Sequence, residues 1–158
     1  MSTNYSENSL VRRVQTIADY QFGRFVGTAL FPEGCEFTLS TTGRIRQILF
    51  EGKRLATVRA RDGRLTLGIE GARRLHEILP APDYRVFILT DVAEFVAQGK
   101  NTFAKHVVSA DPQIRAGDEV LVVSGDDRLV ACGTAMLSGE EMLAFNYGVA
   151  VKVRQGSG

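Results

Sequence analysis

Apolar residues recur with helical spacing near the start of the chain. Within residues 10–20, Leu10, Val14 and Ile17 lie at i, i+4 and i+7 and therefore share one face of a helix. Gly23 is a suitable end for this helix. The pattern predicts an N-terminal helix with one buried face.

The next pattern is that of a small sheet. Residues 41–69 predict three short strands of an antiparallel meander, separated by turns at Glu51–Gly52 and Asp62–Gly63. The second turn is the stronger signal, since Asp-Gly suits the positive φ angles of a two-residue hairpin loop. Such a loop would place Val58 opposite Leu67 on an apolar face of the sheet.

The other face of this hairpin would hold three arginines, Arg59, Arg61 and Arg64, with Arg61 directly opposite Arg64. Like charges in such a cross-strand pair are destabilising by roughly a few tenths of a kcal/mol, which an anionic partner would offset. The competing explanation is that the long side chains extend separately into water. The three arginines are therefore candidate secondary contacts to an anion.

A connector separates this part from the rest of the chain. Residues 70–79 predict an amphipathic helix that ends at Pro80, and the sequence LPAPDY (79–84) has the two prolines of a stiff linker. The apolar run RVFIL (85–89) then predicts a strand.

A short helix is expected directly after that strand. TDVAEFVAQ (90–98) has Thr90 or Asp91 as its cap, apolar residues including Phe95 on its inward face, and Gly99 at its left-handed end.

The remaining sequence predicts mostly strands. NTFAKHVV (101–108) is expected to form a mixed basic and apolar strand, and residues 149–154 a closing one. Between them, Ser138 and Glu141 form a capping box for a short helix that stops at Gly148. The predicted fold class is α+β.

Two units make up this predicted fold. Residues 1–79 would form a small α/β unit with a three-stranded antiparallel meander, and residues 84–155 a mixed β-barrel with two short helices. With 44% hydrophobic residues, the chain has enough apolar material for packed cores.

Charge and motif content exclude several classes of function. The net charge is +1, with 12 Lys and Arg against 9 Asp and Glu in residues 1–83 and 7 against 9 afterwards, so neither half is a polybasic arm. Cys35 and Cys132 lack metal-ligand companions and are expected to be free thiols. Neither histidine stands in a nucleophile motif, and no glycine-rich phosphate-binding motif occurs. We therefore expect no catalytic residues, no metal and no cofactor.

The expected compartment is the cytoplasm. No apolar run approaches the roughly 20 residues of a membrane span, and the polar start MSTNYSENS lacks the apolar segment of a signal peptide. We expect no membrane contact.

The second half of the chain carries a family resemblance. Residues 84–154 resemble a PUA domain, the RNA-binding module named for pseudouridine synthases and archaeosine transglycosylases, through the Gly99–Lys100 break, NTFAKHVV, AGDEVLVV, ACGTAMLSGEEM and GVAVKVR. The first half, through IADYQFG, TGRIRQIL, ATVRARDG and IEGARRLH, resembles the domain that precedes PUA in archaeal tRNA-guanine transglycosylases. The catalytic barrel and zinc site of that family are missing from these 158 residues.

The resemblance implies an archaeal protein that binds structured RNA, above all the acceptor stem and 3′ end of tRNA. In such PUA domains the first helix, the glycine loop after it, the adjoining strand and the last strand form much of the RNA surface. The matching positions in this sequence are Gly99, Lys100, Asn101, Phe103, Lys105, His106, Lys152 and Arg154.

The chemistry of these residues agrees with that role. Glycine permits a phosphate or ribose to approach the backbone, Asn101 both donates and accepts hydrogen bonds, and Phe103 is able to stack on an unpaired base. Each residue also has a structural explanation. Gly99 suits a plain helix end, Phe103 suits a core, the lysines suit a solvated surface, and His106 suits a peripheral position.

Three classes of function remain open at this point. The first is a noncatalytic tRNA-binding module, free-standing and acting beside a base-modifying enzyme such as a transglycosylase. The second is a protein-interaction subunit of a tRNA-modifying enzyme, with little RNA affinity of its own. The third is a small enzyme with a site of unfamiliar design.

Overall fold

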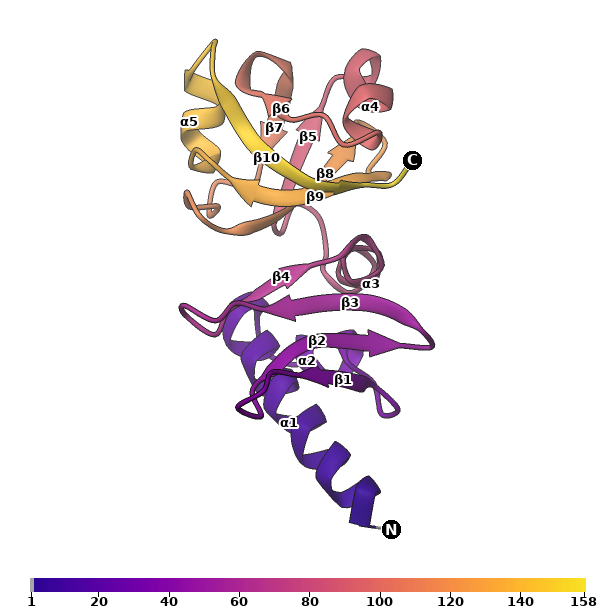
Figure 1. The fold of residues 1–158 in the computed structure, drawn as a ribbon. Helices are drawn as coiled ribbons and strands as arrows, with labels where there is room; N and C mark the ends of the chain where they lie inside the picture. The colour runs from indigo at the N-terminus through magenta and orange to yellow at the C-terminus, as the bar shows by residue number, and fades with distance from the viewer. Residues whose placement is uncertain (1) are drawn as a thin grey trace. The chain divides into compact units, whose positions relative to one another are not determined.

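The computed structural model describes residues 2–158, which form two compact units (Figure 1). The first unit runs up to Ile78, and the second spans Leu79–Gly158. Each unit has its own sheet and its own buried apolar residues.

The first unit is an antiparallel four-stranded sheet packed with helices. The strands lie in chain order across the sheet: β1 (Glu36–Leu39), β2 (Ile45–Phe50), β3 (Lys53–Val58) and β4 (Leu65–Leu67). The helices are α1 (Ser2–Phe22), α2 (Val26–Leu30) and α3 (Ile69–Ile78). In Figure 1, α1 passes behind the sheet and continues beyond it.

The predicted N-terminal helix is confirmed, and it begins well before residue 10. Its buried face consists of Val11, Val14, Ala18 and Phe22, at positions i, i+3, i+7 and i+11. Ile17 lies at the margin of this face and is half-buried.

The sheet has one strand more than the predicted meander. The additional strand β1 lies at the edge of the sheet, where none of its four residues is fully buried. Its sequence EFTL alternates polar and apolar residues, but the run is four residues long, the shortest from which a strand is predicted.

The predicted register of the β3–β4 hairpin is wrong. Val58 lies opposite Leu65 and not opposite Leu67, because the loop contains four residues, 60–63. The Arg59 N–H donates to the Arg64 carbonyl (2.8 Å), which closes the loop. Arg61 therefore lies in the loop and does not face Arg64.

The second unit is a six-stranded mixed sheet that curls into a barrel (Figure 1). Its strand order is β6-β10-β9-β8-β5-β7, in which only β5 and β8 run parallel. The strands are β5 (Arg85–Ile88), β6 (Thr102–Phe103), β7 (Val107–Ala110), β8 (Glu119–Ser124), β9 (Leu129–Ala135) and β10 (Val149–Gly156). All six residues of β8 are buried, as expected for a central strand with a continuous apolar run.

Two α-helices accompany the barrel, which confirms the predicted α+β architecture. They are α4 (Thr90–Ala97) and α5 (Gly139–Ala144), and a 3₁₀ turn, η1 (Ala104–His106), follows β6. The capping box of Ser138 and Glu141 at the start of α5 is confirmed.

Three local predictions in this unit are wrong. Helix α4 begins without a side-chain cap, and Thr90 and Asp91 are its first two residues. Helix α5 ends at Ala144, four residues before Gly148. The predicted strand at 101–108 is divided by η1, whose 3₁₀ backbone removes residues 104–106 from the sheet.

One ion pair fixes the turn between β8 and β9. The buried Arg85 side chain donates from Nε to the Asp127 carboxylate at 2.7 Å, while Nη1 donates to the Asp83 carbonyl at 3.3 Å. Asp127 has a φ angle of 61°. The acidic pair Asp126–Asp127 thus belongs to a structural turn.

Replacing Asp127 with Asn should lower the free energy of unfolding by about 1.5 kcal/mol, because a buried guanidinium loses its charged partner. Asparagine tolerates the positive φ angle, so the decrease in the free energy of unfolding measures the loss of the ion pair. Urea unfolding measures it. Glu94→Gln, which neutralises an exposed carboxylate on α4, should change the value by less than about 0.5 kcal/mol. Equal values for the two variants would contradict this role.

Candidate nucleic-acid interface

The C-terminal end of α4 forms a glycine loop with a defined hydrogen-bond pattern. The Gly99 N–H donates to the Val96 carbonyl (2.9 Å) and the Lys100 N–H donates to the Phe95 carbonyl (3.2 Å), which is a Schellman motif. Gly99 has a φ angle of 104°, and a Cβ atom built there meets nothing within 4 Å. Glycine is therefore required by the backbone angle, and the space beside it is open.

The last residues of the chain are bound to this loop. The Gly158 N–H donates to the Ala97 carbonyl at 2.9 Å, and a Cβ atom on Gly156 would lie 1.9 Å from the same oxygen. Only glycine at position 156 allows this approach. Strand β10 and the end of α4 thus hold each other in place.

Asn101 fixes the loop to β10 from the other side. Its Oδ1 accepts a hydrogen bond from the Val153 N–H at 3.0 Å. Asn101 is exposed, and its side-chain N–H groups have no hydrogen-bond partner among the described residues. Its acceptor therefore has a structural role, while its donors remain available to a ligand.

The three lysines of the second unit lie on adjoining elements. Lys100 belongs to the glycine loop, Lys105 to η1 and Lys152 to β10, and all three are exposed. Strand β10 pairs with β6, which joins the loop to η1, with Val151 opposite Thr102. We call the set Phe95, Gly99, Lys100, Asn101, Phe103, Lys105 and Lys152 the glycine-loop surface.

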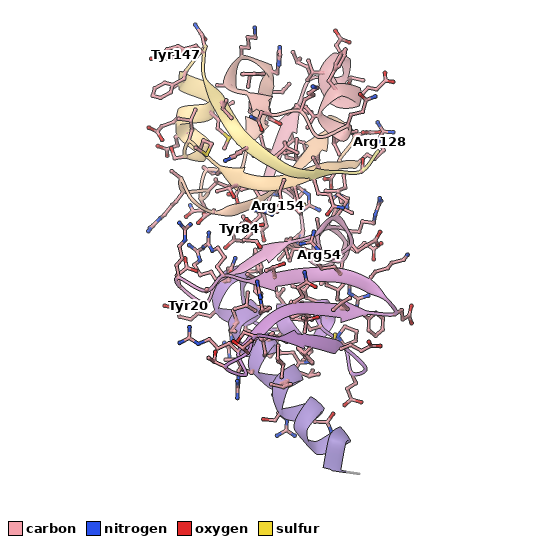
Figure 2. The ribbon with its side chains drawn as sticks, in the orientation of Figure 1. Tyr20, Arg54, Tyr84, Arg128, Tyr147 and Arg154 are labelled. Atoms are coloured by element: carbon pink, nitrogen blue, oxygen red, sulfur yellow. The ribbon has the colours of Figure 1, made fainter. Side chains whose placement is uncertain are left out.

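Arg154 has a different position from the lysines. Its guanidinium makes an ion pair with Glu119, whose side chain is 2% exposed, and also donates to the Thr134 hydroxyl at 3.1 Å. The positive charge of Arg154 is therefore balanced within the protein (Figure 2 labels this residue). No local sequence pattern indicates this pair, because its members are 35 residues apart.

Two aromatic side chains are exposed on the glycine-loop surface. Phe103 is 41% exposed and makes an edge contact with His106, whose ring centroid lies 6.2 Å away. Phe95 is 61% exposed, so its predicted inward orientation is wrong; Ala93 and Val96 are the buried residues of α4. His106 is half-buried, and its carbonyl accepts from the Leu89 N–H (3.0 Å), which agrees with a structural role.

The positive charge of the three hairpin arginines in the first unit is partly neutralised. The Asp62 carboxylate contacts Arg59 Nη2 at 2.9 Å and accepts from the Arg64 N–H at 3.0 Å. That backbone hydrogen bond, followed by the charge of Arg59, lowers the pKa of Asp62. Asp62 thus stays ionised at neutral pH and offsets one positive charge of the hairpin, while Arg61 is exposed in the loop.

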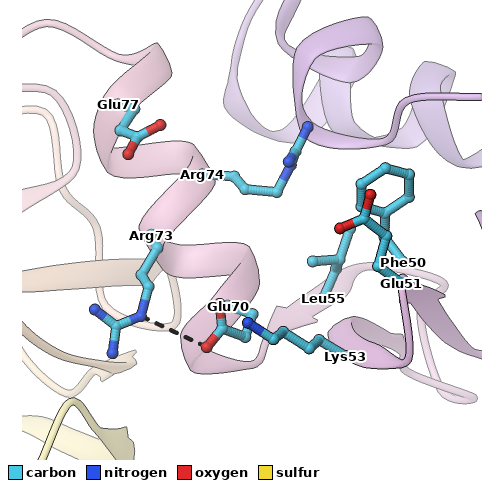
Figure 3. Close-up of a pocket in the computed structure, with 8 residues that line it drawn as sticks. All are labelled: Phe50, Glu51, Lys53, Leu55, Glu70, Arg73, Arg74 and Glu77. Atoms are coloured by element: carbon cyan, nitrogen blue, oxygen red, sulfur yellow. Dashed lines mark ion pairs between the residues drawn. The ribbon is translucent and has the colours of Figure 1, made fainter.

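A pocket of about 280 Å³ lies on the first unit beside α3 (Figure 3). Three cations (Lys53, Arg73 and Arg74) and three carboxylates (Glu51, Glu70 and Glu77) line it together with Phe50 and Leu55. Arg73 pairs with Glu70 at 3.6 Å, and Arg74 donates to the carbonyls of Ala29 and Leu30. The lining is formally neutral and contains neither histidine nor cysteine.

The two cysteines of the described residues, Cys35 and Cys132, are buried and not joined in a disulfide. Burial raises the pKa of Cys35 to about 11, which keeps it protonated. Within residues 2–158, no three His, Cys, Asp or Glu side chains gather as metal ligands would. Nor does that part of the chain contain a helix with the length and apolarity needed to cross a membrane.

Each of the two units matches a known domain family. Residues 84–156 match the PUA domain, and residues 12–82 match the patch-forming domain C2 of tRNA-guanine transglycosylase. The second unit therefore matches a PUA domain, and the first unit matches the transglycosylase C2 domain in front of it.

The relatives are archaeal enzymes. The chain is 52% identical over 151 residues to the tRNA-guanine(15) transglycosylase of Pyrococcus abyssi, a match that covers 96% of this chain and 26% of that protein. For the Methanocaldococcus jannaschii enzyme the identity is 41% over 157 residues, covering 98% and 24%. The chain thus resembles part of a tRNA-guanine(15) transglycosylase and spans about a quarter of its length.

Solved structures share the fold. A hypothetical protein of Pyrococcus horikoshii OT3 aligns with a TM-score of 0.71 at 23% identity, covering 93% of this chain and 89% of that chain. A conserved PUA domain protein of Thermoplasma acidophilum aligns at 0.66 and 20%, covering 96% and 91%.

Replacing Asn101 with Ala should lower the free energy of unfolding by about 1 kcal/mol, because the Val153 N–H loses its acceptor. Asn101→Asp keeps an acceptor oxygen at this position and should remain within about 0.5 kcal/mol of the parent protein. Urea unfolding of both variants distinguishes these outcomes. If Ala and Asp substitutions behave alike, the bond to β10 does not hold the loop.

Proposed function

We propose that these two domains form a noncatalytic RNA-binding module that binds the acceptor stem and 3′ end of tRNA. The observation that carries this proposal is the glycine-loop surface, where three exposed lysines, an open glycine backbone and two exposed aromatic rings lie on adjoining elements of the second unit. The match of residues 84–156 to the PUA domain and the similarity to transglycosylases support this class of ligand.

Each component of the surface has a distinct task in this proposal. Lys100, Lys105 and Lys152 contact backbone phosphates, which supplies affinity that depends on salt. The open space at Gly99 admits a phosphate or ribose close to the backbone N–H and C=O groups. Duplex RNA displays ribose hydroxyls in its shallow minor groove, so short polar contacts of this kind recognise its shape.

The aromatic rings are assigned to the end of the duplex. Phe95 is exposed, and its carbonyl accepts the Schellman hydrogen bond from the Lys100 N–H, so we assign its ring to the same surface. Stacking of an aromatic ring on a base contributes about 1–3 kcal/mol. We assign Phe95 and Phe103 to contacts with terminal or unpaired bases.

The second candidate function is protein interaction. The second unit has a formal charge of −2 from Tyr84 onward, with 7 Lys and Arg against 9 Asp and Glu, so its lysines are a local feature. Under this alternative, the exposed aromatic rings meet a tRNA-modifying catalytic subunit, and RNA affinity requires that partner. Binding to RNA by the purified chain separates the two functions.

Reversing two lysine charges should weaken tRNA binding and flatten its salt dependence. For Lys100→Glu/Lys105→Glu, the slope of log affinity against log salt should fall by about 1.5, because each lost phosphate contact removes about 0.7–0.9. Fluorescence anisotropy across a salt series measures this slope. An unchanged slope would remove both lysines from the surface that meets RNA.

The matched control is Arg115→Glu/Arg128→Glu, which makes the same change in charge at two exposed residues in the loops before and after β8. It should leave the slope within about 0.5 of the parent value. A tRNA trimmed of its 3′ terminal nucleotides should bind the parent protein more weakly. No binding at about 50 mM salt, where phosphate contacts are strong, would favour protein interaction.

The hairpin arginines provide a separate test of the first unit. Asp62→Asn removes the carboxylate that pairs with Arg59, so RNA affinity should rise about two- to threefold at low salt if the hairpin faces phosphate. An Arg61→Gln variant should show the opposite change. Unchanged affinity in both variants would limit the RNA surface to the second unit.

A further inference from the structure

The loop between α5 and β10 presents two aromatic rings together. The rings of Phe145 and Tyr147 are nearly parallel, with centroids 6.1 Å apart and an angle of 10° between their planes. Phe145 is 37% exposed and Tyr147 is 76% exposed. Figure 2 shows Tyr147 projecting outward from the loop that leads into β10.

Backbone hydrogen bonds hold this loop at both ends. The Phe145 N–H donates to the Glu141 carbonyl (2.9 Å) and so fastens the first ring to the end of α5. The Gly148 carbonyl accepts from the Ala104 N–H (2.9 Å) and so fastens the segment after Tyr147 to η1. The backbone on both sides of the two rings is therefore fixed within the second unit.

The same contact joins the aromatic pair to the glycine-loop surface. Val149, two residues after Tyr147, lies opposite Phe103 in the β6–β10 pairing. Lys105 follows Phe103 by two residues in η1 and is exposed. Phe103 and Lys105 thus lie on backbone that is hydrogen-bonded to the segment directly after the two rings.

We propose that the Phe145–Tyr147 pair binds an unpaired nucleotide of the RNA, beyond the duplex end that the glycine-loop surface holds. This inference rests on the proposed function. The base stacks on the exposed face of Tyr147 and extends the two-ring stack, and the phenol hydroxyl is able to hydrogen-bond with the base or ribose. Stacking on a ring accepts any base, so the site favours single-stranded RNA without selecting a sequence.

The test compares two hairpin RNAs with the same duplex, one blunt and one with a four-nucleotide 3′ overhang that contains 2-aminopurine. The parent protein should bind the overhang RNA about tenfold more tightly than the blunt RNA, with quenching of 2-aminopurine on stacking. Tyr147→Ala should lose most of this gain and the quenching, while its affinity for the blunt hairpin stays unchanged.

Two further variants separate stacking from other effects. Tyr147→Phe keeps a flat ring and should retain most of the gain, whereas Tyr147→Leu keeps an apolar side chain without a ring and should lose it. Tyr20→Ala removes an aromatic ring that is exposed on α1 of the first unit and should not change the gain. A thermal unfolding curve for each variant checks that it is folded.

The outcomes that overturn the inference differ from those that overturn the proposed function. Full gain in Tyr147→Leu excludes the stacking site while the proposed function stands. Equal binding of blunt and overhang RNA by the parent protein excludes the stacking site and the 3′-end contacts together, and leaves duplex binding. An equal loss for both RNAs in Tyr147→Ala assigns the ring to the duplex and overturns the inference as well. Failure of the parent protein to bind either hairpin overturns both proposals.

Discussion

The mutual docking of the chain's last residues and the C-terminal end of α4 is the constraint on which the candidate site depends. The Ala97 carbonyl, which would otherwise lack a partner at the helix end, accepts from Gly158, and Gly156 has no side chain to obstruct that approach. Asn101 adds a third contact through Val153. These contacts set the position of the glycine loop relative to β10, and with it the spacing of the exposed lysines.

The predictable parts of the fold are those in which local periodicity and tertiary packing agree. The N-terminal helix, the central apolar strand β8 and the capping box at Ser138 follow from patterns within a few residues. Strand β1 lies at a sheet edge, and its alternation of polar and apolar residues covers only four positions, so the signal is weak. The hairpin loop differs from the prediction because the Asp62 carboxylate binds a backbone N–H and a guanidinium across the turn.

The loop of the candidate site could be predicted from the sequence, but the long-range contacts around the site could not. Gly99, Lys100 and Asn101 follow directly after a helix, and their places are confirmed by the Schellman motif. The orientation of Phe95 depends on which face of α4 packs against the barrel. In a helix this short, the spacing of the apolar residues does not identify the buried face clearly. The pairing of Arg154 with Glu119 and the approach of Gly148 to Ala104 join distant parts of the chain, which no local pattern encodes.

The pairing of Arg154 with the buried Glu119 leaves ammonium groups as the available cations of the glycine-loop surface. An arginine fork recognises base edges and phosphates through two directed hydrogen bonds, whereas an ammonium group is a compact charge with freely rotating donors. Under the proposed function, a surface equipped in this way would sense where phosphates lie and would be nearly indifferent to the order of the bases. It would therefore accept the ends of many RNAs of the same shape, so that any choice of one nucleotide within them has to be made by a different protein surface.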